Sequence, residues 1–373
     1  MMATAALYKP TVGKSGEFIR RSAKFRNWVK SWSNTSSEEK PTYVAEKGRY
    51  HLFVAYACPW ACRCLAVRNM KRLENVISVS VVHSCFLPTR DPAVDPHVGW
   101  HFRNPTDEPV ELPNGAKVNC DDYLTGCPDP VTGCVCVRDI YEQEMDKLNF
   151  SEEERRGVAF SVPILYCKKT NHIVCNESED IIRILTKEFD EFCEDVKDED
   201  DERGYAMGKN LNLFPEVLQE EILNVNKWIY ENINNGVYRC GFAQSQEAYD
   251  FAAKNLFTHL DRVEEILSKQ RYMVQNKFTE ADIRLFVTLI RFDEVYVVHF
   301  KTSKKCIREY PNMLNFCREL YSIQAIKKSV VMQHIRDHYY TSHANINKFG
   351  IRAISPGFLD ILESQPHDRN RFQ

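Results

Sequence analysis

The sequence predicts a chain in two parts, an α/β domain followed by an all-α domain. Three patterns predict this fold class: a strand, a helix and a strand over residues 49–83, a strand hairpin followed by a helix over 161–187, and helically spaced apolar residues from 209 onward. With 373 residues, of which 43% are hydrophobic and 27% charged, the chain is long enough to bury two cores.

The first half opens with a β-α-β unit. An apolar run reaches Tyr56, a helix is predicted over 59–71, and Val-rich residues 76–82 read as a buried strand. This order is typical of a β-α-β unit, in which a helix connects two parallel strands.

A long segment over 84–135 follows, in which prolines and glycines replace any regular period. We expect an irregular insertion, of a length that is usually functional or disordered. Cys120, Cys127, Cys134 and Cys136 lie in the second half of this segment or directly after it. Their spacing does not match the usual zinc patterns, so no metal is predicted, and their role is left open between free thiols and a regulatory disulfide.

Regular structure resumes with a helix near Val137, then two strands over 161–167 and 172–175, and a helix that starts near Ser178. Pro163 enters the first of these strands. Since proline is poorly tolerated inside an interior strand, Pro163 is read either as an edge-strand residue or as a cis proline.

The domain boundaries follow from composition. Residues 1–48 form an N-terminal arm and 49–187 the α/β domain. An acidic run from residue 188 is too charged to bury, so 188–208 are expected to form a solvated linker. An all-helical domain over 209–345 and a tail over 346–373 complete the chain.

One helix start in the second half is explicit in the sequence. Thr279 is an N-cap residue, Asp282 stands three positions later as in a capping box, and Phe278 precedes them as a hydrophobic staple. A buried helix is therefore predicted over 278–292.

Composition also bears on the binding partners and the cellular location of the protein. The formal net charge of -3 shows no basic bias, so nucleic acid is not expected as a partner. No apolar stretch reaches the roughly 20 residues of a membrane span, which predicts a soluble protein. The 14 cysteines without an apolar leader favour a reducing, cytoplasmic location. Basic residues near the N-terminus suit organelle targeting less well than an ordered arm, because Glu17, Phe18 and Phe25 interrupt them.

Cys58 is the strongest candidate for a catalytic residue. It stands between the first strand and a helix that begins with Pro59, where free backbone N–H groups and the helix dipole favour a thiolate. Ala61 occupies the position where a dithiol oxidoreductase has its second cysteine. The resolving thiol must therefore come from another molecule.

Several short motifs in the chain resemble one known family, the glutathionyl-hydroquinone reductases, which are the xi class of glutathione transferases. The matching segments are Cys58-Pro59-Trp60-Ala61, Gly99-Trp100-His101-Phe102, Asn176-Glu177-Ser178, Asn234-Asn235-Gly236-Val237-Tyr238-Arg239, Gly241-Phe242-Ala243, Thr279-Glu280-Ala281-Asp282-Ile283-Arg284-Leu285, Arg291-Phe292-Asp293-Glu294-Val295-Tyr296 and His338-Tyr339-Tyr340. Their order over about 280 residues is highly specific.

The resemblance implies a thioredoxin-like N-terminal domain, a glutathione-transferase helical C-terminal domain, a homodimer, and glutathione as co-substrate. It implies removal of a glutathionyl group from a hydroquinone, with Cys58 as the nucleophile and Tyr238 as the proton donor. The other implied roles are glutathione binding by Trp100, Arg138, Val162, Glu177 and Ser178, and stabilisation of the thiolate by Tyr296 and Tyr339. The physiological quinone is not implied.

Each of these residues also has a simpler reading. Cys58 alone could be a buried apolar residue, Glu177 with Ser178 could be a helix cap, and Trp100 with the tyrosines could be packing residues. At the level of the protein, the alternatives are an omega-like thiol transferase or dehydroascorbate reductase, and a non-catalytic interaction module that reuses the fold.

Overall fold

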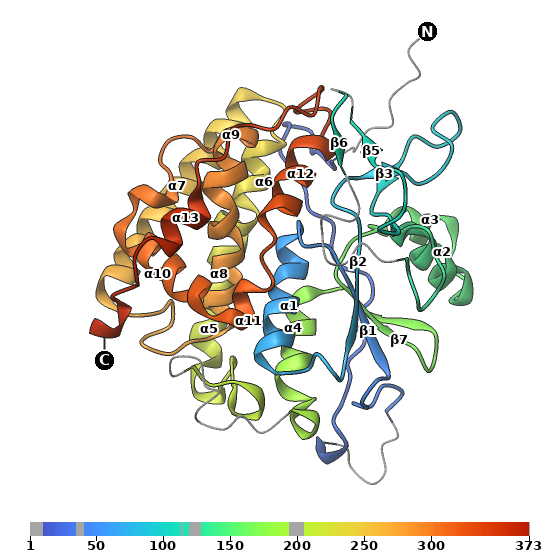
Figure 1. Ribbon diagram of the computed structural model, residues 1–373, viewed down its shortest axis with the longest axis horizontal. Coiled ribbons are helices and arrows are strands. Elements are labelled where there is room, and N and C mark those ends of the chain that lie inside the picture. Colours follow the sequence, from blue (N-terminus) through green and yellow to red (C-terminus); the bar gives the residue numbers. More distant parts are fainter. Residues whose placement is uncertain (1–9, 35–40, 113–114, 119–127, 194–204, 373) are drawn as a thin grey trace.

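The computed structural model describes residues 10–34, 41–112, 115–118, 128–193 and 205–372. Figure 1 shows a helical half beside a sheet half, with α1 (Pro59–Met70) and α4 (Ser178–Lys187) between them. Helix α1 packs on α4 and also on α8 (Glu280–Arg291) and α11 (Gln324–Lys327) of the helical half. The predicted α/β and all-α halves are thus both present and share an interface along α1.

A four-stranded sheet forms the core of the first half, in the order β2-β1-β7-β8. Strand β1 (Tyr50–Val54) is parallel to β2 (Ser78–Val81) and antiparallel to β7 (Ile164–Cys167), which pairs in turn with β8 (His172–Cys175). All five residues of β1 are buried, as a central strand covered on both faces requires. The peptide bond between Val162 and Pro163 is cis, so Pro163 is the cis proline that the sequence offered as one of two interpretations.

The N-terminal arm covers the open edge of this sheet. The Asn27 N–H donates to the Val174 carbonyl at 2.9 Å, and the Asn176 N–H donates to the Phe25 carbonyl at 3.0 Å. Phe25 itself is buried. Residues 25–27 of the arm therefore pair with backbone groups that an edge strand would otherwise leave open, and the aromatic residue Phe25 is packed there.

The segment after β2 is more regular than its proline content suggested. Strand β3 (Leu87–Pro88) pairs with β4 (Val98–Gly99), and β5 (Val110–Glu111) pairs with β6 (Lys117–Val118). Two-residue strands are too short to show a period in sequence. Cys134 and Cys136 are free and buried, whereas Cys120 and Cys127 lie outside the described residues.

Two helices precede β7. Helix α2 (Val137–Lys147) begins at the predicted residue, and the short helix α3 (Glu152–Arg156) was not predicted. Ser151 caps α3 through a capping box with Glu154. The box was readable as Ser-x-x-Glu, but no apolar period follows it, and apolar periodicity is the main sequence indicator of a helix.

The described residues of the second half are helical, with five helices of 11 to 24 residues and several shorter ones. Its elements among the described residues are η4 (Gly208–Asn210), η5 (Glu216–Leu218), α5 (Gln219–Ile229), η6 (Tyr230–Asn234), α6 (Gly236–Gly241), α7 (Gln246–Lys269), α8, η7 (Phe292–Tyr296), α9 (Val297–His299), η8 (Ile307–Glu309), α10 (Pro311–Ser322), α11, α12 (Met332–Ser342), α13 (Phe358–Glu363) and η9 (Arg369–Arg371). Helix α8 starts with the predicted capping box, in which the Thr279 N–H donates to Asp282 at 2.9 Å. Two π-helical turns, η6 and η7, interrupt the α-helical hydrogen bonding, and such turns are frequent at functional sites.

The start of the acidic run is less exposed than the sequence indicated. Glu188, at the start of the acidic run, is buried and accepts hydrogen bonds from Trp28 Nε1 at 3.0 Å and from the Ser31 N–H at 2.9 Å. The reading of this run as too charged to bury is wrong for Glu188, because the arm supplies donors for it. The first turn after it is η2 (Asp190–Phe192), and 194–204 lie outside the described residues.

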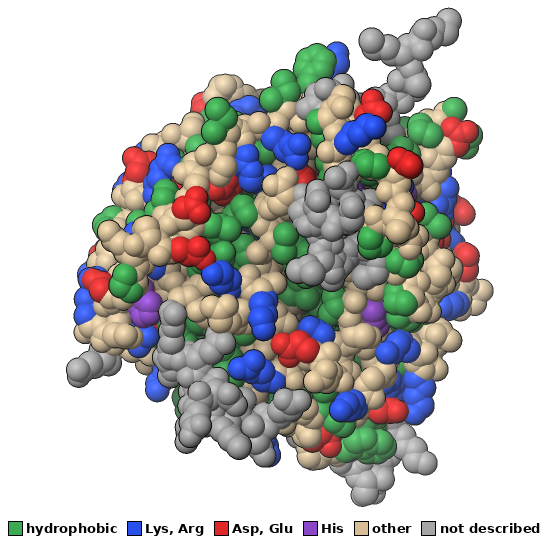
Figure 2. All heavy atoms as spheres, in the orientation of Figure 1, with side chains coloured by type: hydrophobic (Ala, Val, Ile, Leu, Met, Phe, Trp, Pro, Cys, Tyr) green, Lys and Arg blue, Asp and Glu red, His purple; other side chains and the backbone are tan. Residues whose placement is uncertain are grey.

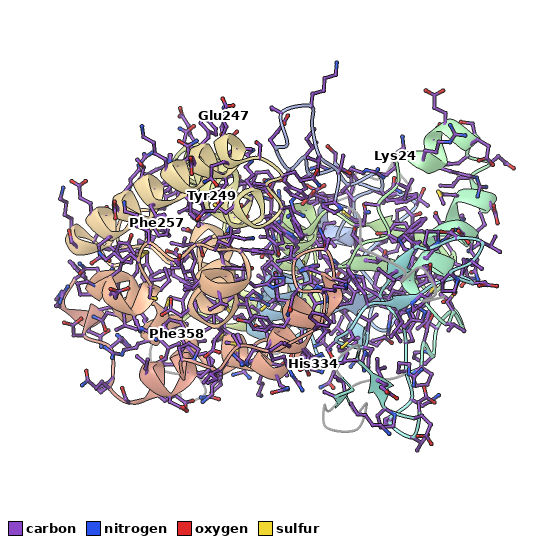
Figure 3. All side chains as sticks on the ribbon, turned by 90° about the horizontal axis from the view of Figure 1, so that it is seen from above. Lys24, Glu247, Tyr249, Phe257, His334 and Phe358 are labelled. Atoms are coloured by element: carbon purple, nitrogen blue, oxygen red, sulfur yellow. The ribbon has the colours of Figure 1, made fainter. Side chains whose placement is uncertain are left out.

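The tail is likewise packed. Phe358 in α13 is buried, and Arg369 donates to the Leu267, Gln270 and Arg271 carbonyls. Figure 3 shows Phe358 on the helical side of the molecule.

The outer surface carries charges of both signs. Figure 2 shows acidic and basic side chains interspersed over both halves of the face that it draws. Within the described ranges, no helix combines the length and the apolar character that crossing a membrane requires.

Candidate active site

Cys58 occupies the junction between β1 and α1, as its N-cap residue, with Pro59 in the first helical position. Its thiol donates to the Val162 carbonyl at 3.4 Å, directly before the cis bond. Both residues line a cavity of about 1030 Å³ between the two halves. The cavity is large enough for a ligand of drug size, with the thiol exposed to it.

Arg291, from the end of α8, fixes the backbone that leads into Cys58. It is fully buried and donates to the Tyr56 carbonyl at 2.9 Å and to the Ala57 carbonyl at 3.2 Å. The helical half thus supports the loop that carries the thiol.

Burial raises the pKa of the Cys58 thiol above its usual value. The backbone N–H groups of Ala61 and Trp60, and then the charges of Arg291 and Arg20, act in the opposite direction without overcoming the burial. The prediction of a lowered pKa is therefore wrong for the ligand-free chain. The sequence showed the helix terminus but could not show which distant residues partly bury the thiol.

Three tyrosines form one chain of hydroxyl groups beside the cavity. The Tyr238 and Tyr339 hydroxyls are 2.5 Å apart, and the Tyr339 and Tyr296 hydroxyls are 3.0 Å apart. Tyr238 and Tyr339 line the cavity, whereas Tyr296 lies behind them and is fully buried. Burial raises the pKa of all three tyrosines, so they stay protonated and can donate.

An aromatic surface that includes Trp100 forms another wall. The Trp100 ring stacks on His338 with centroids 4.5 Å apart and an angle of 25°, and Phe86 meets it edge-on, also at 4.5 Å. Burial lowers the pKa of His338 to about 3, so the imidazole is neutral. This wall suits a flat or thioether-containing ligand.

The polar end of the cavity lies at the start of α4. Glu177 is the N-cap residue, and its carboxylate accepts from the Glu179 N–H at 3.1 Å. Ser178 Oγ accepts from Arg63 at 2.5 Å, and Arg63 also pairs with Glu177 at 3.7 Å. Arg63 is buried, and its Nε and Nη1 have no partner in the described part of the chain. A helix N-terminus beside a buried cation favours an anionic group such as a carboxylate.

Most of the predicted site residues meet at this cavity. Its walls include Cys58, Trp100, Val162, Glu177, Ser178, Tyr238 and Tyr339. Arg138 does not line it: its guanidinium is engaged by Asp95 and Glu142, each at 2.6 Å. This geometry gives no support to Arg138 as a direct contact, since the two carboxylates engage its Nε and Nη1 atoms.

Sequence reasoning missed four residues of the site. Arg291 and His338 stand inside motifs that were noticed, so their position in the chain was a usable indication. Arg63 and Arg20 gave none, because a basic residue on a helix or in an arm is usually solvated. Within the described ranges, no group of three or more His, Cys, Asp or Glu side chains is arranged to hold a metal ion.

Comparison with known proteins agrees with this geometry. Residues 246–319 match the family model "Glutathione S-transferase, C-terminal domain". The chain is 39% identical to the glutathionyl-hydroquinone reductase YqjG of Escherichia coli over 96% of this chain and 94% of that protein. The glutathione-bound structure of YqjG superposes with a TM-score of 0.75 at 37% identity, covering 94% and 97% of the two chains.

Two fungal relatives are similar over comparable lengths. A Schizosaccharomyces pombe protein named glutathione S-transferase omega-like 2 is 36% identical over 92% of this chain and 94% of its own. The structure of the xi glutathione transferase of Phanerochaete chrysosporium superposes with a TM-score of 0.75 at 38% identity. The match covers 94% of this chain and 100% of that chain. Sequence, fold and site lead to the same assignment: the chain is an enzyme of the glutathione transferase family and belongs to its xi class, the glutathionyl-hydroquinone reductases.

Proposed function

We propose that this enzyme removes the glutathionyl group from glutathionyl-hydroquinones through a Cys58-glutathione mixed disulfide. The observation that carries the proposal is the placement of the Cys58 thiol in one cavity with a hydroxyl chain that starts at Tyr238. A thiol nucleophile and a phenolic acid are the two groups that reductive cleavage of an aryl thioether needs.

In the first step, the Cys58 thiolate attacks the glutathione sulfur. The bond between that sulfur and the ring carbon breaks, the carbon takes a proton from Tyr238, and hydroquinone leaves. As the bond between the Cys58 sulfur and the glutathione sulfur forms, these two atoms are oxidised and the ring gains two electrons. The Tyr238 phenolate, which lines the cavity, accepts a hydrogen bond from Tyr339 at 2.5 Å, with Tyr296 next at 3.0 Å, until a proton from solvent restores it after hydroquinone leaves.

In the second step, a free glutathione thiolate attacks the mixed disulfide, which releases oxidised glutathione and the Cys58 thiolate. Ala61 has no sulfur to compete with this external thiol. The kinetics should therefore be ping-pong.

The glutathionyl part has matching groups in the cavity. Its γ-glutamyl end would bind at Glu177 and Ser178, where Arg63 supplies a positive charge beside the N-terminus of α4. The Val162 backbone would hold its peptide part, and Trp100 would cover it. The glutathione-bound structure of YqjG supports this assignment of the co-substrate.

The test is incubation of the protein with a glutathionyl-hydroquinone and free glutathione. We expect one hydroquinone and one oxidised glutathione for each substrate consumed. Failure to release hydroquinone would refute the proposal.

A second candidate is an omega-like thiol transferase, which the name of the fission-yeast relative favours. It would use Cys58 in the same way but would not depend on Tyr238, since a departing thiolate needs no proton on carbon. Turnover of mixed disulfides or dehydroascorbate, with no release of hydroquinone, would support it. The homodimer and the cytoplasmic location stay predictions.

A further inference from the structure

Arg20 extends from the N-terminal arm into the active-site cavity. Its guanidinium carbon lies 4.6 Å from the centroid of the Tyr238 ring and 4.9 Å from that of Trp60. Its Nε donates to Asn235 Oδ1 at 2.5 Å, three residues before Tyr238. Two aromatic faces and one hydrogen bond thus fix the cation beside the proposed proton donor.

One nitrogen of this fixed guanidinium is unused. Nη2 of Arg20 is buried without a hydrogen-bond partner, and no carboxylate in the described ranges forms an ion pair with Arg20. A buried donor without an acceptor is costly, and a rigid one can serve a ligand without further loss of side-chain entropy. The arm therefore offers a donor to the cavity's occupant.

The other anionic or accepting groups at the site already have donors. The thiol of Cys58 faces the N–H groups of Ala61 and Trp60 and the charge of Arg291, each with more influence on it than Arg20. The polar end, where glutathione would bind, has Arg63 with its own two unpartnered nitrogens. The group that remains without a donor is the oxygen on the ring of the substrate.

We propose that Arg20 donates a hydrogen bond from Nη2 to a ring oxygen of the glutathionyl-hydroquinone and so selects phenolic substrates. A cation there stabilises the anionic form of that oxygen, which directs electron density to the ring carbon that Tyr238 protonates. This inference rests on the proposed function and adds a substrate-contacting residue that neither domain supplies.

The experiment compares two glutathionyl donors in single turnover, with the Cys58 adduct followed by mass spectrometry. One is a glutathionyl-hydroquinone, and the other is the mixed disulfide of glutathione with 2-mercaptoethanol, which carries the same glutathionyl group without a ring. Arg20→Met keeps the apolar stem and removes the donors. Lys24→Met is the control, because Lys24 is an exposed basic residue of the same arm and does not line the cavity.

We expect Arg20→Met to slow adduct formation from the glutathionyl-hydroquinone by about tenfold to a hundredfold, as loss of a charge-assisted hydrogen bond does. Its rate with the mixed disulfide should fall by no more than about twofold, because the charge of Arg20 lowers the pKa of the Cys58 thiol less than Ala61, Trp60 and Arg291 do. Lys24→Met should change neither rate, and Arg20→Lys should recover part of the loss because it restores the charge.

The alternatives give different results. Equal slowing with both donors would overturn the inference, because Arg20 would then act on glutathione or on the thiol. No slowing with either donor would also overturn it and would leave the proposed function intact. If the wild-type protein forms the adduct only from the disulfide, the proposed function fails instead.

Discussion

The reactivity of Cys58 depends on two opposed effects at a single sulfur atom. Burial raises the pKa of the thiol, whereas the backbone N–H groups of α1 and the charges of Arg291 and Arg20 lower it. The sequence predicted the second effect from Pro59 and the helix start. It could not predict the first, because burial depends on residues of the helical half that are far away in the chain.

The raised pKa of Cys58 fixes the pH dependence of the first step. Below the pKa the thiol is protonated and inert, so the adduct rate should rise about tenfold per pH unit through the neutral range. Stopped-flow or quenched-flow measurement of the adduct from pH 6 to 9 checks this, with Cys58→Ser as the background. A plateau at or below pH 7 would contradict the account.

Tyr238 should matter to carbon protonation and not to thiol exchange. Tyr238→Phe removes the proton donor, so hydroquinone release should slow by about a hundredfold or more. Resolution of a preformed Cys58-glutathione disulfide by glutathione should be unchanged. Tyr249→Phe is the matched control, since Tyr249 lies on α7, does not line the cavity, and donates its hydroxyl to the Lys301 carbonyl. If Tyr238→Phe and Tyr249→Phe slow hydroquinone release equally, Tyr238 is not the proton donor.

At the scale of elements, regular segments were predictable and short ones were not. The strands β1, β2, β7 and β8 and the capped start of α8 had clear patterns, and each lies where its pattern indicated. The two-residue strands of the insertion have no room for a period. Glu188 was misread because its donors, Trp28 and Ser31, are separated from it by more than 150 residues of sequence.

The junction of β1 with α1 should depend on α8 through Arg291. Arg291→Met leaves the Tyr56 and Ala57 carbonyls without their donor in a buried site, so the free energy of unfolding should fall by about 2–4 kcal/mol. The pKa of the Cys58 thiol should rise further, since a nearby positive charge is lost. Denaturant unfolding and the pH profile of alkylation measure the two effects.

The control for that variant is Arg262→Met, which alters an exposed arginine whose guanidinium lies 4.3 Å from the Trp228 ring centroid. It should change stability by no more than about 0.5 kcal/mol. If Arg291→Met lowers the free energy of unfolding by no more than Arg262→Met does, then α8 does not stabilise the junction of β1 with α1.

At the scale of the whole molecule, the cavity exists only because four parts of the chain converge. The arm brings Arg20, the α/β half Cys58, the insertion Trp100 and the helical half Tyr238. The resemblance of short motifs predicted three of these contributions, although periodicity alone predicted only the two halves. The arm was missed because its contacts are set by tertiary packing and leave no repeat in sequence.

The C-terminal residues should also contribute to global stability. Phe358→Ala opens a cavity beneath α13 and should lower the free energy of unfolding by about 3–5 kcal/mol. The rate constants of the folded protein should not change, because Phe358 does not line the active site. Phe251→Ala, at a position that is 68% exposed, should have little effect. Equal unfolding midpoints for the two variants would mean that the tail is not part of the folded unit.

The central claim is that Cys58 accepts the glutathionyl group from an aryl thioether. Its most direct test is mass spectrometry after one turnover with one equivalent of glutathionyl-hydroquinone and no free glutathione. The account predicts one glutathione in disulfide linkage on Cys58, one free hydroquinone, and loss of the adduct on addition of glutathione. A ring attached to any cysteine, or free hydroquinone with Cys58 unmodified, would contradict it.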